Sequence, residues 1–425
     1  MSFVHLHNHT IFSAMDGVCQ PADLARLAAE DGQPAVALTD HGTMAGMVGF
    51  NKACKQYGVK PIFGLEAYFV EWDSVLPVLT KPLTFHLTIL AMTRKGLRNL
   101  MQLQSKAFGE DGVQRVTLEL LSKYSDGLIV LSGCLYGFIH NMAVRHGIAS
   151  GHIPIDKTKL DVDKLWLPNK YNGEYSTATE NMTEALKSIF RDNFYIELQY
   201  HGLLEQEYFN STVAPALASK FDIKTVCTND IHYPAPADAL THGYLTAIRR
   251  HQQGGPVKIF NDMHFKSADE MTQLFPKAAQ TTLEINEKIK PNVLDLTRWI
   301  PQFDTGGRSA DDLLADKAWL NFPKMYAKND VVAINRLEEE LKVISTLGFS
   351  DYLLIVADLV ERTAKATKRR PGPGRGSAAG SVLVHVLGIT REVDPLKHGL
   401  LFSRFLSKRR FTVDEEKTFA LWSNE

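Results

Sequence analysis

Residues 3–17 read FVHLHNHTIFSAMDG. The stretch opens with a short apolar strand, and side chains two residues apart in a strand lie on the same face. His7 and His9 can therefore bind one metal ion together at the end of that strand. Asp16 follows after a short loop and is a further candidate ligand. His5 alternates with the same pair, but we expect it to be a flanking, hydrogen-bonded histidine.

Short apolar strands alternate with helical stretches over residues 1–235. One expected helix, PADLARLAAEDG at residues 21–32, carries its apolar side chains on one face. This alternation predicts a parallel α/β barrel or a doubly wound sheet. Residues 151–183 are polar and rich in Pro, Lys and Asn, which predicts a surface insertion. The strands are expected at residues 3–7, 35–39, 61–70, 87–92, 127–131, 194–199 and 224–228.

More potential metal ligands fall at the ends of these strands. The C-terminal strand ends of an α/β barrel build its active site, so we expect most of these side chains to converge on one rim. His86 fits less well, because it lies at the start of its strand. A mixture of imidazole, carboxylate and thiolate ligands suits zinc, manganese or iron. The candidates are His41, Glu66, Cys134, Asp230 and His232.

Other residues near these positions are assigned smaller roles. Asp40, next to His41, is a candidate for orienting a ligand by a hydrogen bond. The remaining histidines have no paired ligand spacing, so we expect them at the surface or in the core. They are His201, His242, His251, His385 and His398.

The composition excludes several classes of protein. The 425 residues carry 47 Lys and Arg against 48 Asp and Glu, which excludes a wholly basic nucleic-acid coat protein but not a local basic patch. Four scattered cysteines without a CxxC pair argue against a disulfide framework and favour a reducing compartment. No apolar run reaches ~18 residues, and the N-terminus is not a signal peptide. We therefore expect a cytoplasmic protein with no membrane partner.

A second region carries a glycine-rich segment, RRPGPGRGSAAGS, at residues 369–381. Helical periodicity precedes it at residues 310–327, 330–347 and 351–366. Glycines let backbone N–H groups approach an anion, and a helix expected to start near Ser377 would add the positive end of its dipole. No Gly-Lys-Ser/Thr ends the segment, so it is not a Walker A motif.

The chain resembles a known family along nearly its whole length, to about Leu406. The quoted N-terminal stretch resembles the polymerase-and-histidinol-phosphatase (PHP) domain of bacterial C-family replicative polymerases, most closely the DNA polymerase III alpha subunits. The further motifs that carry the resemblance are ALTDHGTMAG at 37–46, PIFGLEAY at 61–68, SGCLYG at 132–137, FYIELQYHGL at 194–203 and TNDIHY at 228–233.

The resemblance implies a fold and a metal centre. A distorted seven-stranded (β/α) PHP barrel is expected over residues 1–285, followed by a partial, mixed α/β polymerase palm over 286–425 with its nucleotide-binding loop at 371–381. Up to three divalent metal ions are implied, with Glu66 bridging two of them. The catalytic residues would be Glu66, His7, His9 and Asp230. The implied ligands are His7, His9, Asp16, His41, Glu66, His86, Cys134, Asp230 and His232.

The implied chemistry is phosphoester hydrolysis, of the kind associated in this family with 3′–5′ exonuclease proofreading. Clustered metals lower the pKa of a bound water and stabilise charge on the phosphate. Two alternatives remain open: a stand-alone metallo-phosphoesterase, and a non-catalytic scaffold that binds DNA or another replication protein. An amidohydrolase also opens with HxH, but Glu66 stands where that class commonly has a carbamylated lysine, and Cys134 is foreign to it.

The glycine-rich loop resembles the GPGRGS motif of the palm. Arg375, Gly376 and Ser377 would then hold the triphosphate of a nucleotide, and Lys368, Arg369 and Arg370 would contact DNA with an affinity that falls steeply with salt. The resemblance stops near residue 407, where the family has alternating aspartates for its catalytic magnesium ions. Asp414 and Glu416 would be at most a degenerate pair.

We therefore expect that the chain alone does not polymerise DNA. It would be a truncated or split polymerase subunit, completed by a C-terminal polymerase fragment or by other replisome subunits.

Overall fold

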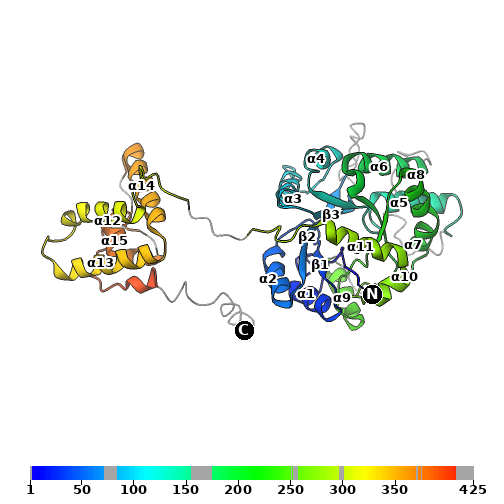
Figure 1. Cartoon of the computed structure of the whole chain (residues 1–425), viewed down its shortest axis with the longest axis horizontal. Coiled ribbons are helices and arrows are strands. Elements are labelled where there is room, and N and C mark those ends of the chain that lie inside the picture. Colours follow the sequence, from blue (N-terminus) through cyan, green and yellow to red (C-terminus); the bar gives the residue numbers. More distant parts are fainter. Residues whose placement is uncertain are drawn as a thin grey trace. The chain divides into compact units, whose positions relative to one another are not determined.

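The computed structural model describes most of the chain as two compact units, Met1–Asp295 and Leu296–Glu425 (Figure 1). Four residues singled out in the sequence lie outside the described part, namely Arg370, Arg375, Asp414 and Glu416. Much of the expected insertion, residues 155–174, also lies outside it. The described residues are 2–70, 84–154, 175–249, 251, 257–295, 301–369, 372–374 and 376–407.

One curled sheet forms the centre of the first unit, with its strands in chain order. The first two strands are parallel, as are the last three, but β3 is antiparallel to both of its neighbours. The prediction of a fully parallel sheet is therefore wrong. Most positions in these strands are buried, and such apolar runs look the same in either direction. The strands are β1 (Ala35–Leu38), β2 (Lys60–Phe69), β3 (Phe85–Ala91), β4 (Leu128–Leu131), β5 (Phe194–Leu198) and β6 (Thr225–Cys227).

The first of the seven expected strands, at residues 3–7, does not form as a regular strand. The N-terminal segment nevertheless lies where a seventh strand of the sheet would be. His5 forms a parallel bridge with Val36 of β1, and Asn8 forms one with Ile231 beyond β6. The backbone N–H of His9 donates to the carbonyl of Ile231 at 2.7 Å. Seven strands are not confirmed, but this segment hydrogen-bonds to both ends of the sheet.

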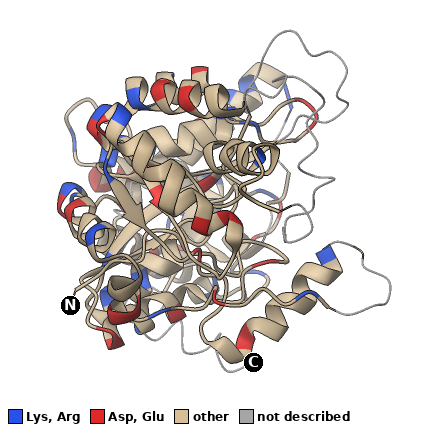
Figure 2. Cartoon of the chain, turned by 90° about the vertical axis from the view of Figure 1, so that its right-hand side faces the viewer, with Lys and Arg blue, Asp and Glu red and all other residues tan. Residues whose placement is uncertain are grey.

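Helices surround the sheet (Figure 1), and lysines and arginines alternate with acidic residues on their outer faces (Figure 2). The expected helix at residues 21–32 is confirmed as α1. The helix α11 spans the expected domain boundary at residues 285 and 286 and packs against β6. The helices are α1 (Pro21–Glu30), α2 (Met47–Tyr57), α3 (Arg94–Lys106), α4 (Leu118–Lys123), α5 (Phe138–Ala149), α6 (Tyr175–Phe190), α7 (Leu204–Tyr208), α8 (Ala214–Phe221), α9 (Ala239–Arg249), α10 (Ala268–Leu274) and α11 (Pro276–Lys288).

The last part of the expected insertion is a core helix. Residues 175–183 begin α6, which buries Ala178, Met182, Leu186 and Phe190 in the main hydrophobic core. Its polar residues mark only the outer face of an amphipathic helix.

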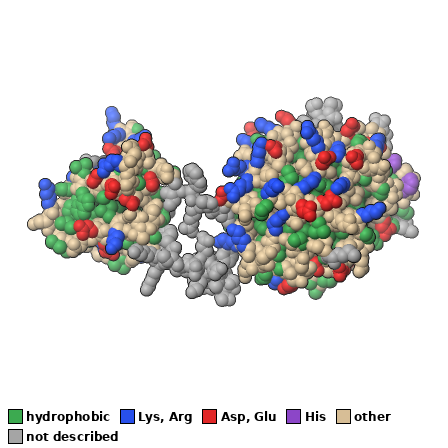
Figure 3. Space-filling view, viewed as in Figure 1, with side chains coloured by type: hydrophobic (Ala, Val, Ile, Leu, Met, Phe, Trp, Pro, Cys, Tyr) green, Lys and Arg blue, Asp and Glu red, His purple; other side chains and the backbone are tan. Residues whose placement is uncertain are grey.

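The described residues of the second unit form helices and no strand. The three expected helices are confirmed as α12 (Ala310–Asn321), α13 (Val331–Thr346) and α14 (Ser350–Thr367), and a short α15 (Val382–Val386) follows. The mixed α/β architecture expected here is therefore not seen in these residues. Their apolar faces share one core, and other hydrophobic side chains gather on the surface shown in Figure 3.

No single helix among the described residues has the length and apolarity needed to cross a membrane. By those two criteria only α13 and α14 taken together qualify, and the pair is bent by 114°.

Candidate functional site

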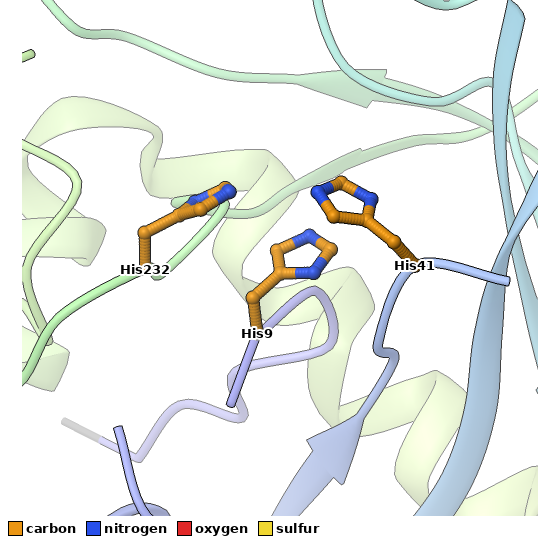
Figure 4. Close-up of side chains that lie close together, drawn as sticks. All are labelled: His9, His41 and His232. Carbon is orange, nitrogen blue, oxygen red and sulfur yellow. The ribbon is translucent and has the colours of Figure 1, made fainter. Parts of the chain in front are cut away.

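The nine expected metal ligands form one continuous cluster in the first unit. His7 and His9 come from the N-terminal segment, His41 follows β1, Cys134 follows β4, and Asp230 and His232 follow β6. The rings of His9, His41 and His232 face one another from three separate segments (Figure 4), with centroids 4.1 Å apart for His9 and His41 and 4.4 Å for His9 and His232.

The antiparallel direction of β3 explains why His86 joins this cluster. His86 lies near the start of β3 and pairs with Tyr68 near the end of β2. Because β3 runs opposite to its neighbours, its N-terminal end lies at the rim where the other strands have their C-terminal ends. The poor fit of His86 in the sequence came from assuming parallel strands.

Glu66, in β2, lies at the centre of the cluster and is 1% exposed. Its Oε1 is 3.1 Å from His7 Nε2 and 3.0 Å from His86 Nδ1. Its Oε2 is 3.6 Å from His9 Nε2 and contacts His41 Nδ1. Burial alone would raise the pKa of this carboxyl group, but the adjoining His86, His41 and His7 lower it well below its usual value.

Several buried polar atoms in this cluster have no hydrogen-bond partner, although they lie close to one another. Unpaired buried polar atoms are costly, so a group of them facing a common space indicates a missing ligand. Because they are lone-pair donors of imidazole and carboxylate groups, a divalent cation fits them. These atoms are His7 Nε2, His9 Nε2, His41 Nδ1, Glu66 Oε2 and Asp230 Oδ1.

Hydrogen bonds from the other side of each ring aim two histidines at that space. His7 Nδ1 donates to Glu197 Oε1 at 2.6 Å, which leaves the lone pair on Nε2. His232 Nδ1 donates to the carbonyl of Asp230 at 2.8 Å and does the same. Metal binding needs neutral imidazole. Although burial opposes it, Glu197, Asp230 and Glu66 raise the pKa of His7 well above its usual value, so a bound cation would displace a proton from this ring.

Asp40, the expected orienting residue, is connected by hydrogen bonds to His9 through Ser13. His9 Nδ1 donates to Ser13 Oγ at 2.9 Å, and Ser13 Oγ donates to Asp40 Oδ1 at 2.7 Å. The backbone N–H of Thr10 also donates to Asp40. Burial, together with His41 and His232, lowers the pKa of His9 to about 3, so its ring is neutral at physiological pH.

Glu197 is a functional residue that the sequence reasoning missed. It is fully buried in β5, where it accepts hydrogen bonds from His7, from the Thr88 hydroxyl at 3.2 Å and from the Gly133 N–H at 3.1 Å. The available signal was a single acidic residue inside the apolar strand FYIEL. Such a residue is almost never fully buried unless it has partners.

Replacing Glu197 with Gln is expected to lower metal affinity by about 10- to 100-fold, because His7 would lose the carboxylate that fixes its tautomer. Calorimetric titration of the metal-free protein with zinc measures the change in affinity. Glu110→Gln, which alters an exposed acid, is the matched control. An unchanged affinity in Glu197→Gln would show that Glu197 does not support the site.

The helix α9 adds residues that the sequence did not assign to the cluster. His242 Nε2 is 2.9 Å from Asp16 Oδ1, and Arg249 forms an ion pair with the same carboxylate. His242 was expected to be an ordinary core or surface histidine. It is buried, but it belongs to the cluster, and with Asp16 and His232 it forms a further group of closely spaced ligand atoms. The signal lay in helical spacing, which puts His242, Thr246 and Arg249 on one face.

The prediction for His5 is confirmed. Its Nε2 is hydrogen-bonded to the carbonyl of Lys266 at 2.7 Å, away from the cluster. Burial lowers its pKa to about 4.

A pocket of about 420 Å³ opens onto the metal-ligand cluster. Six expected ligands line it, together with Tyr68 and Tyr136 and the α9 residues His242, Thr246 and Arg249. The Arg249 side chain is 42% exposed, so a cation stands at the edge of the pocket. The arrangement has room for a phosphate group beside the ligands.

The glycine-rich loop of the second unit differs from its expected structure. Residues 376–380 form a 3₁₀ helix, and α15 begins only at Val382. The first amides of α15 are occupied by Glu340, which accepts from Val382 N at 3.0 Å and from Leu383 N at 2.9 Å. A short 3₁₀ helix therefore begins near Ser377, where a helix was expected, whereas the first amides of α15 are bound by a carboxylate of the protein itself.

Gly376 and Ser377 are exposed, as are Lys368 and Arg369. Lys368 and Arg369 line a pocket of about 530 Å³ between α14 and the residues after α15. Three more cations, Lys324, Lys365 and Arg391, line the same pocket.

Comparison with known proteins assigns both units. The PHP domain family matches residues 5–201, and the bacterial DNA polymerase III alpha NTPase domain family matches residues 312–414. The DNA polymerase III subunit alpha of Aquifex aeolicus is 34% identical over 97% of this chain and 36% of its own length. That of Helicobacter pylori is 31% identical over 98% of this chain and 35% of its own length. The chain thus spans about a third of the length of these relatives.

Among solved structures, an amidohydrolase from Chromobacterium violaceum aligns with 55% of this chain and 88% of its own, at 16% identity and a TM-score of 0.29. The long and consistent sequence matches, by contrast, cover both units. The chain therefore belongs to the family of bacterial DNA polymerase III alpha subunits, and it contains their N-terminal PHP domain together with the NTPase domain.

Proposed function

We propose that the first unit is a metal-dependent phosphoesterase that removes nucleotides from the 3′ end of DNA. The observation that carries the proposal is the group of buried, unpaired imidazole and carboxylate atoms that converge around Glu66. The membership in a DNA polymerase family supports DNA as the substrate, and the pocket over the cluster supplies room for a phosphodiester.

Up to three divalent ions would be held by the cluster. One group of ligand atoms comes from His7, His9 and Glu66, a second from His41, Glu66 and His86, and a third from His9, His41 and His232. Glu66, His9 and His41 each belong to two of these groups, and of the three only Glu66 has two carboxylate oxygens to offer. When bound, such ions lower the pKa of a water molecule and stabilise charge on the phosphate.

The reaction is the addition of water across a P–O bond. The oxygen of water bonds to phosphorus, the bond to the leaving 3′ oxygen breaks, and a proton ends on that oxygen. In this scheme Glu197 and Asp40 keep His7 and His9 oriented, and Arg249 offers its guanidinium to the phosphate. A guanidinium is well suited to bind phosphate oxygens, because it can donate two parallel hydrogen bonds.

The test is release of mononucleotides from single-stranded DNA labelled at its 3′ end, with zinc, manganese and magnesium supplied in turn. We expect metal-dependent release by the wild-type chain, and a decrease of about 100-fold or more in His7→Ala and Asp230→Ala. Glu110→Gln should retain the wild-type rate. If the wild-type chain binds metal but releases no nucleotide with any of the three, the scaffold alternative would be favoured.

We also propose that the second unit contacts phosphate groups of DNA or of a nucleotide. The support is the pocket beside α14, which gathers Lys324, Lys365, Lys368, Arg369 and Arg391 around a single acid, Glu361. Clustered cations of this kind bind nucleic acid chiefly through its phosphates.

A further inference from the structure

A second pocket, of about 310 Å³, adjoins the one over the metal-ligand cluster. The two pockets share a wall, and two of the residues in that wall, Cys134 and Asp230, are candidate metal ligands. The other shared residues are Tyr136, Phe260 and Met263. A phosphodiester bound at the cluster would therefore have one of its substituents at the entrance of this side pocket.

Hydrogen bonds to residues 229–233, the segment that carries the candidate ligands Asp230 and His232, hold the wall between the two pockets in place. The Tyr233 hydroxyl donates to the carbonyl of Phe260 at 2.7 Å and accepts from the N–H of Met263 at 3.2 Å. The Asn229 side chain donates to the carbonyl of Asp262 at 2.8 Å. Because Asn229 and Tyr233 flank the ligands Asp230 and His232, the side pocket is held in a constant position relative to the cluster, as in most preformed ligand sites.

The polar side chains deep in the side pocket already bond to the protein. Gln199 donates to Glu197 at 3.1 Å and to the Thr228 hydroxyl at 3.0 Å. Gln206 donates to His201 Nδ1 at 3.0 Å, and His201 Nε2 is 3.0 Å from the carbonyl of Asn229.

The rest of the lining combines apolar and aromatic residues, among them Leu203, Ile259, Tyr136 and Phe260, with the polar residues Asp230, Lys258, Asn261 and Asp262. Lys258 lies over the Phe260 ring with its ammonium 4.9 Å from the centroid. Such a surface suits a flat ring with an apolar face, and aromatic side chains stack on every nucleobase.

We propose that this side pocket binds the 3′-terminal nucleoside of a single DNA strand whose phosphodiester lies at the metal cluster. The inference rests on the proposed function of that cluster and adds how the substrate is recognised. Gln199, His201 and Gln206 already bond to the protein, and the aromatic rings offer stacking, which does not select one base over another. The volume suits one nucleoside rather than several.

Two phosphodiesters with the same leaving group test the inference in the metal-loaded chain. One is the 4-nitrophenyl ester of thymidine 5′-monophosphate, and the other is methyl 4-nitrophenyl phosphate, in which methyl replaces thymidine. Water adds to phosphorus in both, and 4-nitrophenolate leaves. We expect kcat/KM for the thymidine ester to exceed that for the methyl ester by about tenfold or more, the contribution of stacking one base.

Ile259→Asp is the decisive variant, because Ile259 lines the side pocket and not the pocket over the metal-ligand cluster. Its side chain is 46% exposed, so the protein should still fold. Its ratio of the two kcat/KM values should fall about tenfold. Leu274→Asp, at an exposed apolar residue of α10, should keep the wild-type ratio. A wild-type ratio near one, or an Ile259→Asp ratio equal to that of wild type, would overturn the inference.

If neither ester is hydrolysed, the proposed hydrolysis fails and the side pocket is still tested by binding. Saturation-transfer NMR with thymidine 5′-monophosphate should then show transfer from the protein to the thymine protons, weakened in Ile259→Asp but not in Leu274→Asp. No transfer, or equal transfer in both variants, would contradict the nucleoside pocket.

Discussion

Replacing Glu66 with Gln is expected to slow phosphodiester hydrolysis by about a thousandfold and to lower the metal content of the purified chain. A loss of this size corresponds to about 4 kcal/mol of transition-state stabilisation, which bound metal ions are able to supply. Glu66 is, among the described residues, the carboxylate that meets His7, His9, His41 and His86 together. Gln keeps the shape but removes the negative charge, and it points an amide N–H₂ into a space that should hold cations.

Metal content is measured by elemental analysis after dialysis. The rate of hydrolysis is measured with methyl 4-nitrophenyl phosphate. Glu110→Gln is the control, since that residue is exposed and remote from the cluster in sequence. Thermal unfolding in the presence of a chelator separates loss of metal from loss of fold, because it measures how far the substitution itself changes the stability of the metal-free protein. A Glu66→Gln chain with wild-type metal content and rate would disprove the central position of Glu66.

The closeness of His7 and His9, the proposed metal-binding histidines of the N-terminal segment, was predictable because its geometry is local. A period of two places His7 and His9 on one face whatever surrounds them, and both belong to the cluster. The position of His86 depended instead on the direction of β3. Since β3 is apolar along almost its whole length, its sequence carries no record of that direction.

The supporting residues depended on contacts between segments far apart in the chain. Glu197 meets His7 across 190 residues, and His242 meets Asp16 across 226. The only local signal for the first contact is an acidic residue inside an apolar strand. The only local signal for the second is that three residues of α9 share one helical face. Geometry of this kind arises only once the sheet has closed around the N-terminal segment.

The glycine-rich loop shows the same limit in the second unit. Its glycines predicted an open backbone, and Gly374 and Gly376 do adopt the left-handed region, with φ of 100° and 73°. The helix that follows, however, is capped from α13. Glu340 bonds to Ser381, Val382 and Leu383, which follow it by 41 to 43 residues. No sequence pattern near the loop predicts this contact.

Replacing Glu340 with Ala is expected to destabilise the second unit by about 3 kcal/mol, because it removes a fully buried hub of hydrogen bonds. Glu340 accepts from the Ser381 hydroxyl at 2.6 Å and from the amides of Val382 and Leu383. It also pairs with Arg336 at 2.8 Å, whose guanidinium donates to the carbonyls of Gly380 and Leu400. Burial raises the pKa of Glu340 despite these donors, so the hydrogen bonds offset only part of the cost of burying the charge.

Amide hydrogen exchange is the suitable measurement, because a chain of two units need not unfold in one step. Exchange of the α13 and α15 amides should quicken by about 100-fold in Glu340→Ala, the equivalent of the expected free-energy change. The amides of β1 to β6 in the first unit should keep their protection. Glu339→Ala changes the exposed neighbour on the same helix and controls for helix propensity. Equal protection in the two variants would mean that the loop is held by its apolar contacts in the α12–α15 core, and that the Glu340 cap is dispensable.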